Sequence, residues 1–291
     1  MAPYLHYELL QRTHRALALR AIINEHIKPG MRVLDAGCGS GILSMWAALT
    51  GATVVGVDLA DTTLAQRLVA ENGLNDRVRI VQGDLFKVDL GDAAPFDALL
   101  AMVYLNDPRR DEDRPTLVHG LKQFLKPDAL IVPDRVRYTA APLDWPAQRS
   151  PDRWSRLATG VAGLEDAYGL RMRTFQEMLS QRPNKSLFPH RGPDGMLDLS
   201  GATMLATEHV HHEEDLRNAP TSYPSHLRFT FDRAGEFNVV LWEQELLFQG
   251  ASIFRNRSIG WVDPPALARV GASASLPLDQ RWRRDNLLSV A

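Results

Sequence analysis

The sequence predicts an α/β protein in which a domain built on a parallel sheet precedes a smaller, mostly antiparallel, barrel-like β domain. Apolar strand-like runs alternate with helical patterns over residues 1–133, as expected for a parallel sheet with helices on both faces. From about Met196 onward, short strand-like runs are separated by polar turns, which indicates antiparallel pairing. We therefore expect two domains, residues 1–133 and residues 134–291.

Each element of the first domain has its own pattern of apolar residues and helix breakers. A helix over residues 5–27 ends at Lys28-Pro29-Gly30, where proline and glycine stop a helix. Strands are expected at residues 31–36, 53–58, 78–82, 96–102 and 129–132, and further helices at residues 42–50, 61–72 and 114–125. In the second domain, strands are expected at residues 134–142, 202–206, 227–231, 237–247 and 251–254, with a helical arm near residues 145–180.

Composition and charge exclude several classes of function. The chain carries 33 Lys and Arg against 35 Asp and Glu, so no broad basic face is expected and long nucleic acid is not a predicted partner. Cys38 is the single cysteine, so no intrachain disulfide can form, which fits a reducing compartment. No apolar run approaches the roughly 20 residues that span a membrane, and the N-terminus lacks the apolar stretch of a signal peptide. We therefore expect a cytoplasmic protein with no membrane partner.

A glycine-rich loop follows the first expected strand, in the segment VLDAGCGSGILS at residues 33–44. Gly37, Gly39 and Gly41 give a G-x-G-x-G pattern, in which glycine lets the backbone approach a bulky ligand and adopt positive φ. Ile42 stands where the dinucleotide fingerprint G-x-G-x-x-G has its third glycine, which argues against a nicotinamide or flavin cofactor.

Three acidic residues lie near the ends of the first three expected strands. Asp35 stands just before the glycine loop, where it can orient the loop or meet the ammonium group of a ligand. Asp58 ends the second strand, where a carboxylate can accept hydrogen bonds from ribose hydroxyls. Asp84 follows the third strand and, beside Leu85, can read the amino edge of adenine. Each could also be a turn residue at a strand end, but the three in order favour a nucleoside-containing ligand.

These segments resemble class I methyltransferases, and more particularly the protein arginine methyltransferase family. The resemblance covers roughly residues 4–262 and implies a Rossmann-like class I methyltransferase domain, a β-barrel domain and S-adenosyl-L-methionine as the cofactor. It also implies that Arg15 contacts the carboxylate of the cofactor, and that a homodimer forms through an arm, for which residues 145–180 are the candidate. The matching segments are residues 6–10, 15–22, 33–44 and 125–135, with looser matches at 168–172 and 237–248.

The acceptor side departs from the family pattern. In that family, two glutamates on a loop after the fourth strand clasp the substrate guanidinium. Here the first position corresponds to Met102, and the second falls near Asp111, Glu112 or Asp113. Because a thioether cannot pair with a guanidinium, burying that cation beside Met102 would be costly. The Thr-His-Trp motif of the family's barrel is also not evident, and residues 259–261 (Ile-Gly-Trp) are its nearest counterpart.

Methyl transfer to a neutral nucleophile requires alignment of the reactants and a group that accepts a proton. Met102 is a candidate for contact with the substrate. The loop after the fourth strand supplies the candidates for catalysis: Asp107, Asp111 and Glu112 as proton acceptors, with Tyr104 and Asn106 as groups that position the substrate. The alternative interpretation of this charged run is a solvated surface loop.

Residues 208–215 are rich in histidine and acidic side chains. Imidazoles two residues apart on a strand share a face, so His209 and His211 are candidates for contact with the substrate. No partner ligands stand at a familiar spacing, and we therefore do not expect a metal site. Arg255 and Arg257, on what reads as a short polar loop, could receive an anionic substrate or simply be exposed.

We therefore interpret the sequence as that of an S-adenosylmethionine-dependent N-methyltransferase acting on a guanidine, imidazole or amine nitrogen of a small metabolite or peptide. The first alternative is methylation of a protein side chain, arginine included. The second is a cofactor-binding partner without turnover.

Overall fold

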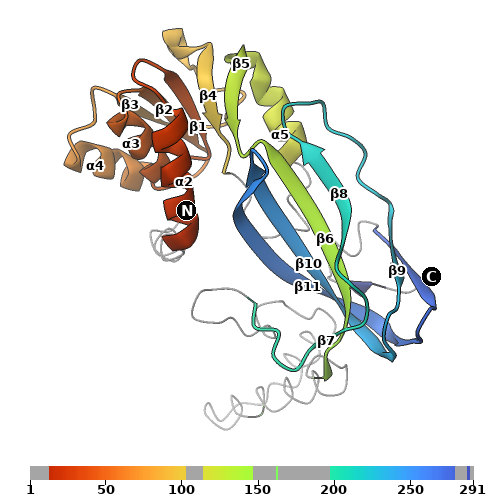
Figure 1. Cartoon of the computed structure of the whole chain (residues 1–291). Coiled ribbons are helices and arrows are strands. Elements are labelled where there is room, and N and C mark those ends of the chain that lie inside the picture. Colours follow the sequence, from red (N-terminus) through yellow and green to blue (C-terminus); the bar gives the residue numbers. More distant parts are fainter. Residues whose placement is uncertain (1–12, 103–113, 147–161, 163–196, 279–286, 289–291) are drawn as a thin grey trace.

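The computed structural model describes residues 13–102, 114–146, 162, 197–278 and 287–288, which form two larger sheets, a two-stranded pair and the covering helices (Figure 1). The first sheet is parallel, with the strand order β3-β2-β1-β4-β5. Its strands are β1 (Arg32–Ala36), β2 (Thr53–Asp58), β3 (Val78–Gln82), β4 (Phe96–Leu100) and β5 (Leu125–Val132). The predicted parallel α/β domain is thereby confirmed.

Four helices connect or precede these strands: α2 (Thr13–His26), α3 (Ile42–Leu49), α4 (Thr63–Glu71) and α5 (Arg114–Leu121). Short 3-10 turns lie at η1 (Gly91–Ala93) and η3 (Lys122–Phe124). Right-handed crossovers between parallel strands put α3 and α4 on one face of the sheet and α5 on the other. Leu19 and Ile23 of α2, together with Ile27 just after the helix, recur every four residues and are buried, which is the spacing of one helix face.

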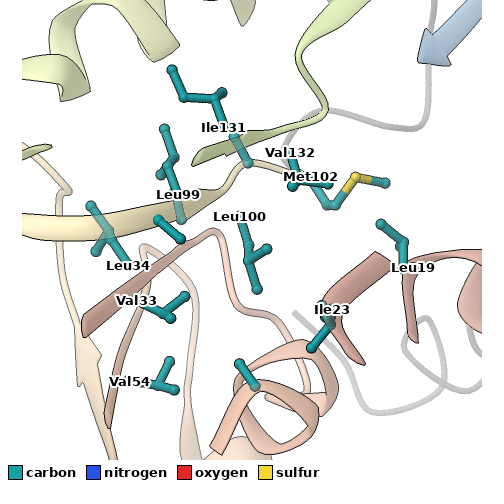
Figure 2. Close-up of a cluster of buried hydrophobic side chains, with 14 of the residues drawn as sticks. Leu19, Ile23, Val33, Leu34, Val54, Leu99, Leu100, Met102, Ile131 and Val132 are labelled. Carbon is teal, nitrogen blue, oxygen red and sulfur yellow. The ribbon is translucent and has the colours of Figure 1, made fainter. Parts of the chain in front are cut away.

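Both faces of the parallel sheet are covered, as its nearly continuous apolar strands predict. In β1, the neighbouring residues Val33 and Leu34 point to opposite faces and are both fully buried. Figure 2 shows these two side chains in the same cluster as Leu19 and Ile23 of α2. The cluster therefore includes residues on both faces of the sheet.

The second sheet extends away from the first and is mostly antiparallel (Figure 1). Its order is β13-β11-β10-β6-β7, with β8 also paired to β6, and β9 and β12 form a separate antiparallel pair. The strands are β6 (Arg135–Asp144), β7 (Thr203–Met204), β8 (His209–Asp215), β9 (His226–Thr230), β10 (Gly235–Phe248), β11 (Ala251–Ala268), β12 (Ser273–Pro277) and β13 (Leu287–Leu288).

One apolar cluster joins the two sheets. It contains residues of the parallel sheet together with Val136 of β6, Leu246 of β10 and Phe254 of β11. The His26 ring of α2 meets Phe248 edge to face, with 5.0 Å between ring centroids. The second sheet is therefore packed against α2, the helix that precedes the glycine loop.

Two expectations for the second domain need correction, and a third is not tested. Strand β11 runs for 18 residues, whereas the sequence predicted only residues 251–254, because polar residues and Pro264-Pro265 interrupt the apolar pattern. Strands β8 and β12 were not among the predicted strands, since charged or small residues fill them. Almost all of the expected arm at 145–180 lies outside the described residues. Among the described residues, no helix is long and apolar enough to cross a membrane.

One face of β6, β8, β10 and β11, which we call the ionic face, carries paired side chains: Arg135, Arg137, Glu213, Glu243, Glu245, Arg255 and Arg257. Arg137 donates to Glu213 at 2.6 Å and to Glu245 at 3.2 Å, which links three strands. Glu243 and Glu245 are almost fully buried, as paired carboxylates can be. Arg255 and Arg257 thus lie on a strand, paired with these glutamates, and not on a polar loop.

Candidate functional site

The strand order places two loops side by side at one edge of the parallel sheet. Strands β2 and β3 lie in succession on one side of β1, and β4 and β5 lie on its other side, so the strand order reverses between β1 and β4. The carboxyl ends of parallel strands at such a reversal are where open α/β sheets bind ligands. The glycine loop follows β1 at this point, and Met102 follows β4.

The glycine loop has the backbone geometry that its sequence predicts. Gly37, Gly39 and Gly41 have φ values of 70°, 56° and 76°, in the left-handed region that glycine adopts without steric cost. A Cβ atom on Gly41 would lie 3.2 Å from the Cβ of Ala65, so α4 also packs closely against the loop. Burial raises the pKa of the Cys38 thiol, so this side chain stays protonated and is not a nucleophile.

Asp58 fixes the glycine loop in addition to ending β2. Its Oδ2 accepts a hydrogen bond from the Gly39 N–H at 2.9 Å, and its Oδ1 accepts one from the Ala60 N–H at 2.9 Å. Each carboxylate oxygen has a second lone pair, so Asp58 can still accept ribose hydroxyl donors. The sequence predicted only the contact with a ligand, and the structure adds the anchoring of the loop.

Asp35 is buried at the start of the loop and is bonded to a residue that the sequence did not single out. The Ser44 hydroxyl of α3 donates to Asp35 Oδ2 at 2.6 Å, and both residues are almost inaccessible to solvent. Burial raises the pKa of Asp35 to about 6, in spite of the lowering effect of Ser44. An ammonium group bound nearby would offset this cost by stabilising the charged carboxylate.

The raised pKa predicts that unliganded protein loses stability as pH rises from about 4 to about 6. In this window the folded state still holds the proton on Asp35, whereas the unfolded state, with an ordinary pKa of 3.8, has released it. A shift of about two units corresponds to a loss of about 3 kcal/mol above pH 6. In Asp35→Asn this contribution disappears. Urea unfolding should therefore show that the free energy of unfolding of the variant, relative to that of the wild type, is higher at pH 8 than at pH 4. The same difference between variant and wild type at both pH values would contradict the raised pKa of Asp35.

Asp84 is held in a local turn. Its Oδ1 accepts the Phe86 N–H at 3.0 Å and its Oδ2 lies 3.1 Å from the Lys87 ammonium, and these two contacts lower the pKa of Asp84. This is the geometry of an Asx-turn. Leu85 packs partly buried against the core. Contact of Asp84 and Leu85 with adenine stays a prediction.

Arg15 lies at the junction between α2 and the second sheet. Its guanidinium is 5.4 Å from the centroid of the Phe254 ring of β11, and its Nη1 atom is buried. The expected contact with the cofactor carboxylate stays a prediction. The position nevertheless shows that Arg15 connects the helix before the glycine loop to the second sheet.

Met102 and Arg114 flank the end of β4. The Met102 side chain is 7% exposed and extends toward Leu19 of α2 in Figure 2. Arg114, at the start of α5, is fully buried and donates to the Ala101 carbonyl at 3.1 Å. From its sequence pattern, Arg114 was expected only to begin a helix. The Met102 side chain is apolar and packs in the core, and its correspondence with the first family glutamate stays a prediction.

The other acceptor-side candidates divide into two groups. Tyr104, Asn106, Asp107, Asp111 and Glu112 lie outside the described residues. His209 and His211 lie on β8, where His211 Nε2 is 2.6 Å from the Tyr223 hydroxyl and the His209 ring meets Phe229 edge to face at 5.3 Å. Within the described part of the chain, no cluster of three or more His, Cys, Asp and Glu side chains could hold a metal ion.

Comparison with known proteins links this site to one group of enzymes. Residues 33–128 match the family described as "Methyltransferase domain". The protein arginine N-methyltransferase 1 of Schizosaccharomyces pombe is 34% identical over 148 residues, which are 48% of this chain and 42% of that protein. The chain therefore matches less than half the length of this relative.

Solved structures extend the likeness in fold to nearly the whole chain. The Trypanosoma brucei PRMT1 enzyme–prozyme heterotetrameric complex with AdoHcy has a TM-score of 0.65 at 17% identity, over 94% of this chain and 86% of that one. Protein arginine methyltransferase 10 of Arabidopsis thaliana has a TM-score of 0.65 at 18% identity, over 94% and 87%. The chain thus has a class I methyltransferase fold with an added antiparallel sheet domain, and it resembles the protein arginine methyltransferases.

Proposed function

We propose that this protein is an S-adenosylmethionine-dependent N-methyltransferase that acts on a small metabolite or peptide. The observation that carries the proposal is the pairing of β1 with β4, which sets the glycine loop beside the buried Met102. The glycine loop fits the methyl donor, and Met102 lacks the carboxylate that a guanidinium acceptor would need. The donor is therefore that of the family, and the acceptor differs.

The residues at the ends of β1 and β2 fit the cofactor. Glycines with positive φ let its bulk approach the backbone, Asp58 retains lone pairs for ribose hydroxyls, and the buried Asp35 gains from a nearby ammonium. Bound S-adenosylmethionine would supply a methyl group on a sulfonium, and the protein's share is alignment and exclusion of water. Calorimetry should detect binding of S-adenosylmethionine and not of NADH, and the reverse result would refute the assignment.

Met102 provides the sharpest test of the acceptor. Restoring a carboxylate with Met102→Glu should raise methylation of arginine-containing peptides by at least about tenfold, since a charge-assisted hydrogen bond contributes about 1.5–3 kcal/mol. Met102→Gln has nearly the same shape without the charge and should give no increase. Initial rates with an arginine peptide measure both variants. High activity of the wild type on such peptides would show that Met102 does not exclude guanidinium.

Methylation of protein arginine is the second candidate function, because the names of the matched relatives describe that activity. It would require carboxylates from the loop between β4 and α5 to replace the charge that Met102 lacks. A cofactor-binding partner without turnover is the third, and detection of S-adenosylhomocysteine formation would exclude it. The domain boundary at Pro133, a homodimer and a cytoplasmic location also stand as proposals.

A further inference from the structure

Buried polar atoms without partners gather on the face of the second sheet opposite the ionic face, which we call the inner face. Gln244 of β10 is completely buried, and neither its side-chain oxygen nor its nitrogen has a hydrogen-bond partner. Ser258 Oγ of β11 and His211 Nδ1 of β8 are also buried without a partner. Such atoms are rare in folded proteins, and each one calls for an explanation.

Strand register places these side chains together. Gln244 lies directly opposite Tyr138 of β6 on one side and Asn256 of β11 on the other. Ser258 follows Asn256 by two residues, and residues two apart on a strand share a face. The His211 ring is 6.3 Å from the ring of Tyr138, measured between centroids, so β8 contributes to the same cluster.

The histidine in this cluster is neutral. Burial, together with His209 and His212, lowers the pKa of His211 to about 3, so its ring carries no charge near pH 7. Its Nε2 is occupied by the Tyr223 hydroxyl at 2.6 Å, which leaves Nδ1 as the free position. The His211 ring also meets the Trp242 ring edge to face at 5.7 Å. The cluster thus combines uncharged hydrogen-bonding groups with flat aromatic surfaces.

Another buried amide on β10, that of Asn238, has hydrogen-bond partners within the protein. Asn238 of β10 accepts the Trp145 N–H at 2.9 Å and donates to the Trp145 carbonyl at 3.0 Å. Both polar atoms of its amide are therefore bonded, while neither polar atom of Gln244, six residues further on, has a partner. Since an unmade buried hydrogen bond costs free energy, Gln244 should persist only if something else uses it.

The cluster lies close to the junction with the cofactor domain. The next row along the strands pairs Leu246 with Phe254, and the Arg15 guanidinium of α2 stands over Phe254. Two residues of strand separate the rows, which is about 7 Å. Tyr223, in the loop between β8 and β9, lies against His211, His212 and Tyr138, so this loop borders the cluster.

We propose that Gln244, Ser258 and His211 form a binding site for an uncharged, planar polar group of the methyl acceptor, of the carboxamide or neutral azole class. This identification of the ligand as the acceptor rests on the proposed methyltransferase function. A carboxamide or azole presents a donor and an acceptor in one plane, which matches the amide of Gln244 and the free Nδ1 of His211.

The charges of the second sheet favour an uncharged group. Glu243 and Glu245 point to the ionic face and are paired with arginines there. Glu214 of β8, which is also buried, already accepts from the Thr221 N–H, the Thr221 hydroxyl and His212. All three carboxylates therefore already accept hydrogen bonds within the protein, so a cation bound at Gln244 would have to share a carboxylate that has other donors, and burying it there would be costly.

Two variants on β10 separate a ligand site from a structural amide. Gln244→Leu removes an amide that has no partner, so the urea midpoint should stay at or above the wild-type value. Asn238→Leu, the matched control, breaks two satisfied hydrogen bonds and should lower the midpoint by at least about 0.5 M. A loss in Gln244→Leu as large as that in Asn238→Leu would overturn the proposal, because it would show that Gln244 has partners within the protein.

Binding measured without the cofactor tests the ligand class. Imidazole at pH 8, where it is neutral, should raise the melting temperature of the wild type, and Gln244→Leu should need at least tenfold more imidazole for the same shift. Methylguanidinium at the same concentration should have no such effect. Equal responses of wild type and variant, no response to imidazole, or a larger response to methylguanidinium would each overturn the proposal. Failure of the methyltransferase assignment would instead appear as absent S-adenosylhomocysteine binding.

Discussion

Asp58→Ala is expected to weaken S-adenosylhomocysteine binding by about 100-fold or more, measured by calorimetry. The substitution removes the acceptor for the Gly39 N–H and for the Ala60 N–H, and thereby loosens the loop that faces the cofactor. It also removes the proposed acceptor for ribose hydroxyls. Hydrogen bonds to a charged group contribute about 1.5–3 kcal/mol each, so the loss of two or more reaches this size.

Asp61→Ala is a suitable control for Asp58→Ala. Asp61 is fully exposed and bonds only within the first turn of α4, where its Oδ1 accepts the N–H and hydroxyl of Thr63. We expect its removal to change cofactor affinity by less than about threefold. If both variants bound S-adenosylhomocysteine as tightly as the wild type, the end of β2 would not be part of the cofactor site.

Trp261→Ala is expected to destabilise the protein by about 3–5 kcal/mol in urea unfolding. The Trp261 side chain is completely buried and packs with Leu241 and Ile259 on one side of the second sheet. Truncation would leave a cavity that these neighbours cannot fill. This result would establish that the Ile-Gly-Trp segment at residues 259–261 is part of the core, as its burial indicates.

A control for Trp261→Ala lies on the same strand. Leu267 is 70% exposed, so Leu267→Ala should change stability by no more than about 0.5 kcal/mol. A different outcome for Trp261→Ala, in which stability is kept but methyl transfer is lost, would mean that this residue contacts the substrate.

The parallel domain could be predicted from the sequence because local patterns determine it. Strands β2 and β3 have the predicted bounds, residues 53–58 and 78–82, since buried apolar runs end at clear breakers. The positive φ of Gly39 and the place of Asp58 also follow from the motif. Order along the chain was therefore enough to place the glycine loop and Asp58 at the same edge of the sheet.

The second domain was harder to predict because its strands are stabilised by partners distant in sequence. In the sequence alone, Glu243 and Glu245 have the charge typical of surface residues. Strand pairing places Arg137, Arg255 and Arg257 beside them, and these ion pairs allow their burial. The same holds for β8, whose acidic residues pair across to β6. Long-range ion pairs leave no periodic signal in a single sequence.

The inner face could not have been found without the strand register. Gln244 reads as one polar residue in an otherwise apolar run, and only the pairing of β10 with β6 and β11 shows that it is buried. His211 lies at an irregularity in the pairing of β8 with β6, and only its ring contact with Tyr138 places it in the cluster, whereas the sequence indicated only that it shares a face with His209. Ser44 was missed for a similar reason, because its bond to Asp35 joins α3 to β1.

The most direct test of the central claim is mass spectrometry of a metabolite extract incubated with the protein and S-adenosylmethionine labelled in its methyl group. We predict that the label appears on nitrogen of a small compound or peptide, together with an equal amount of S-adenosylhomocysteine. Label found only on arginine of proteins would contradict the acceptor part of the claim. Absence of both label transfer and S-adenosylhomocysteine would contradict the assignment as a methyltransferase.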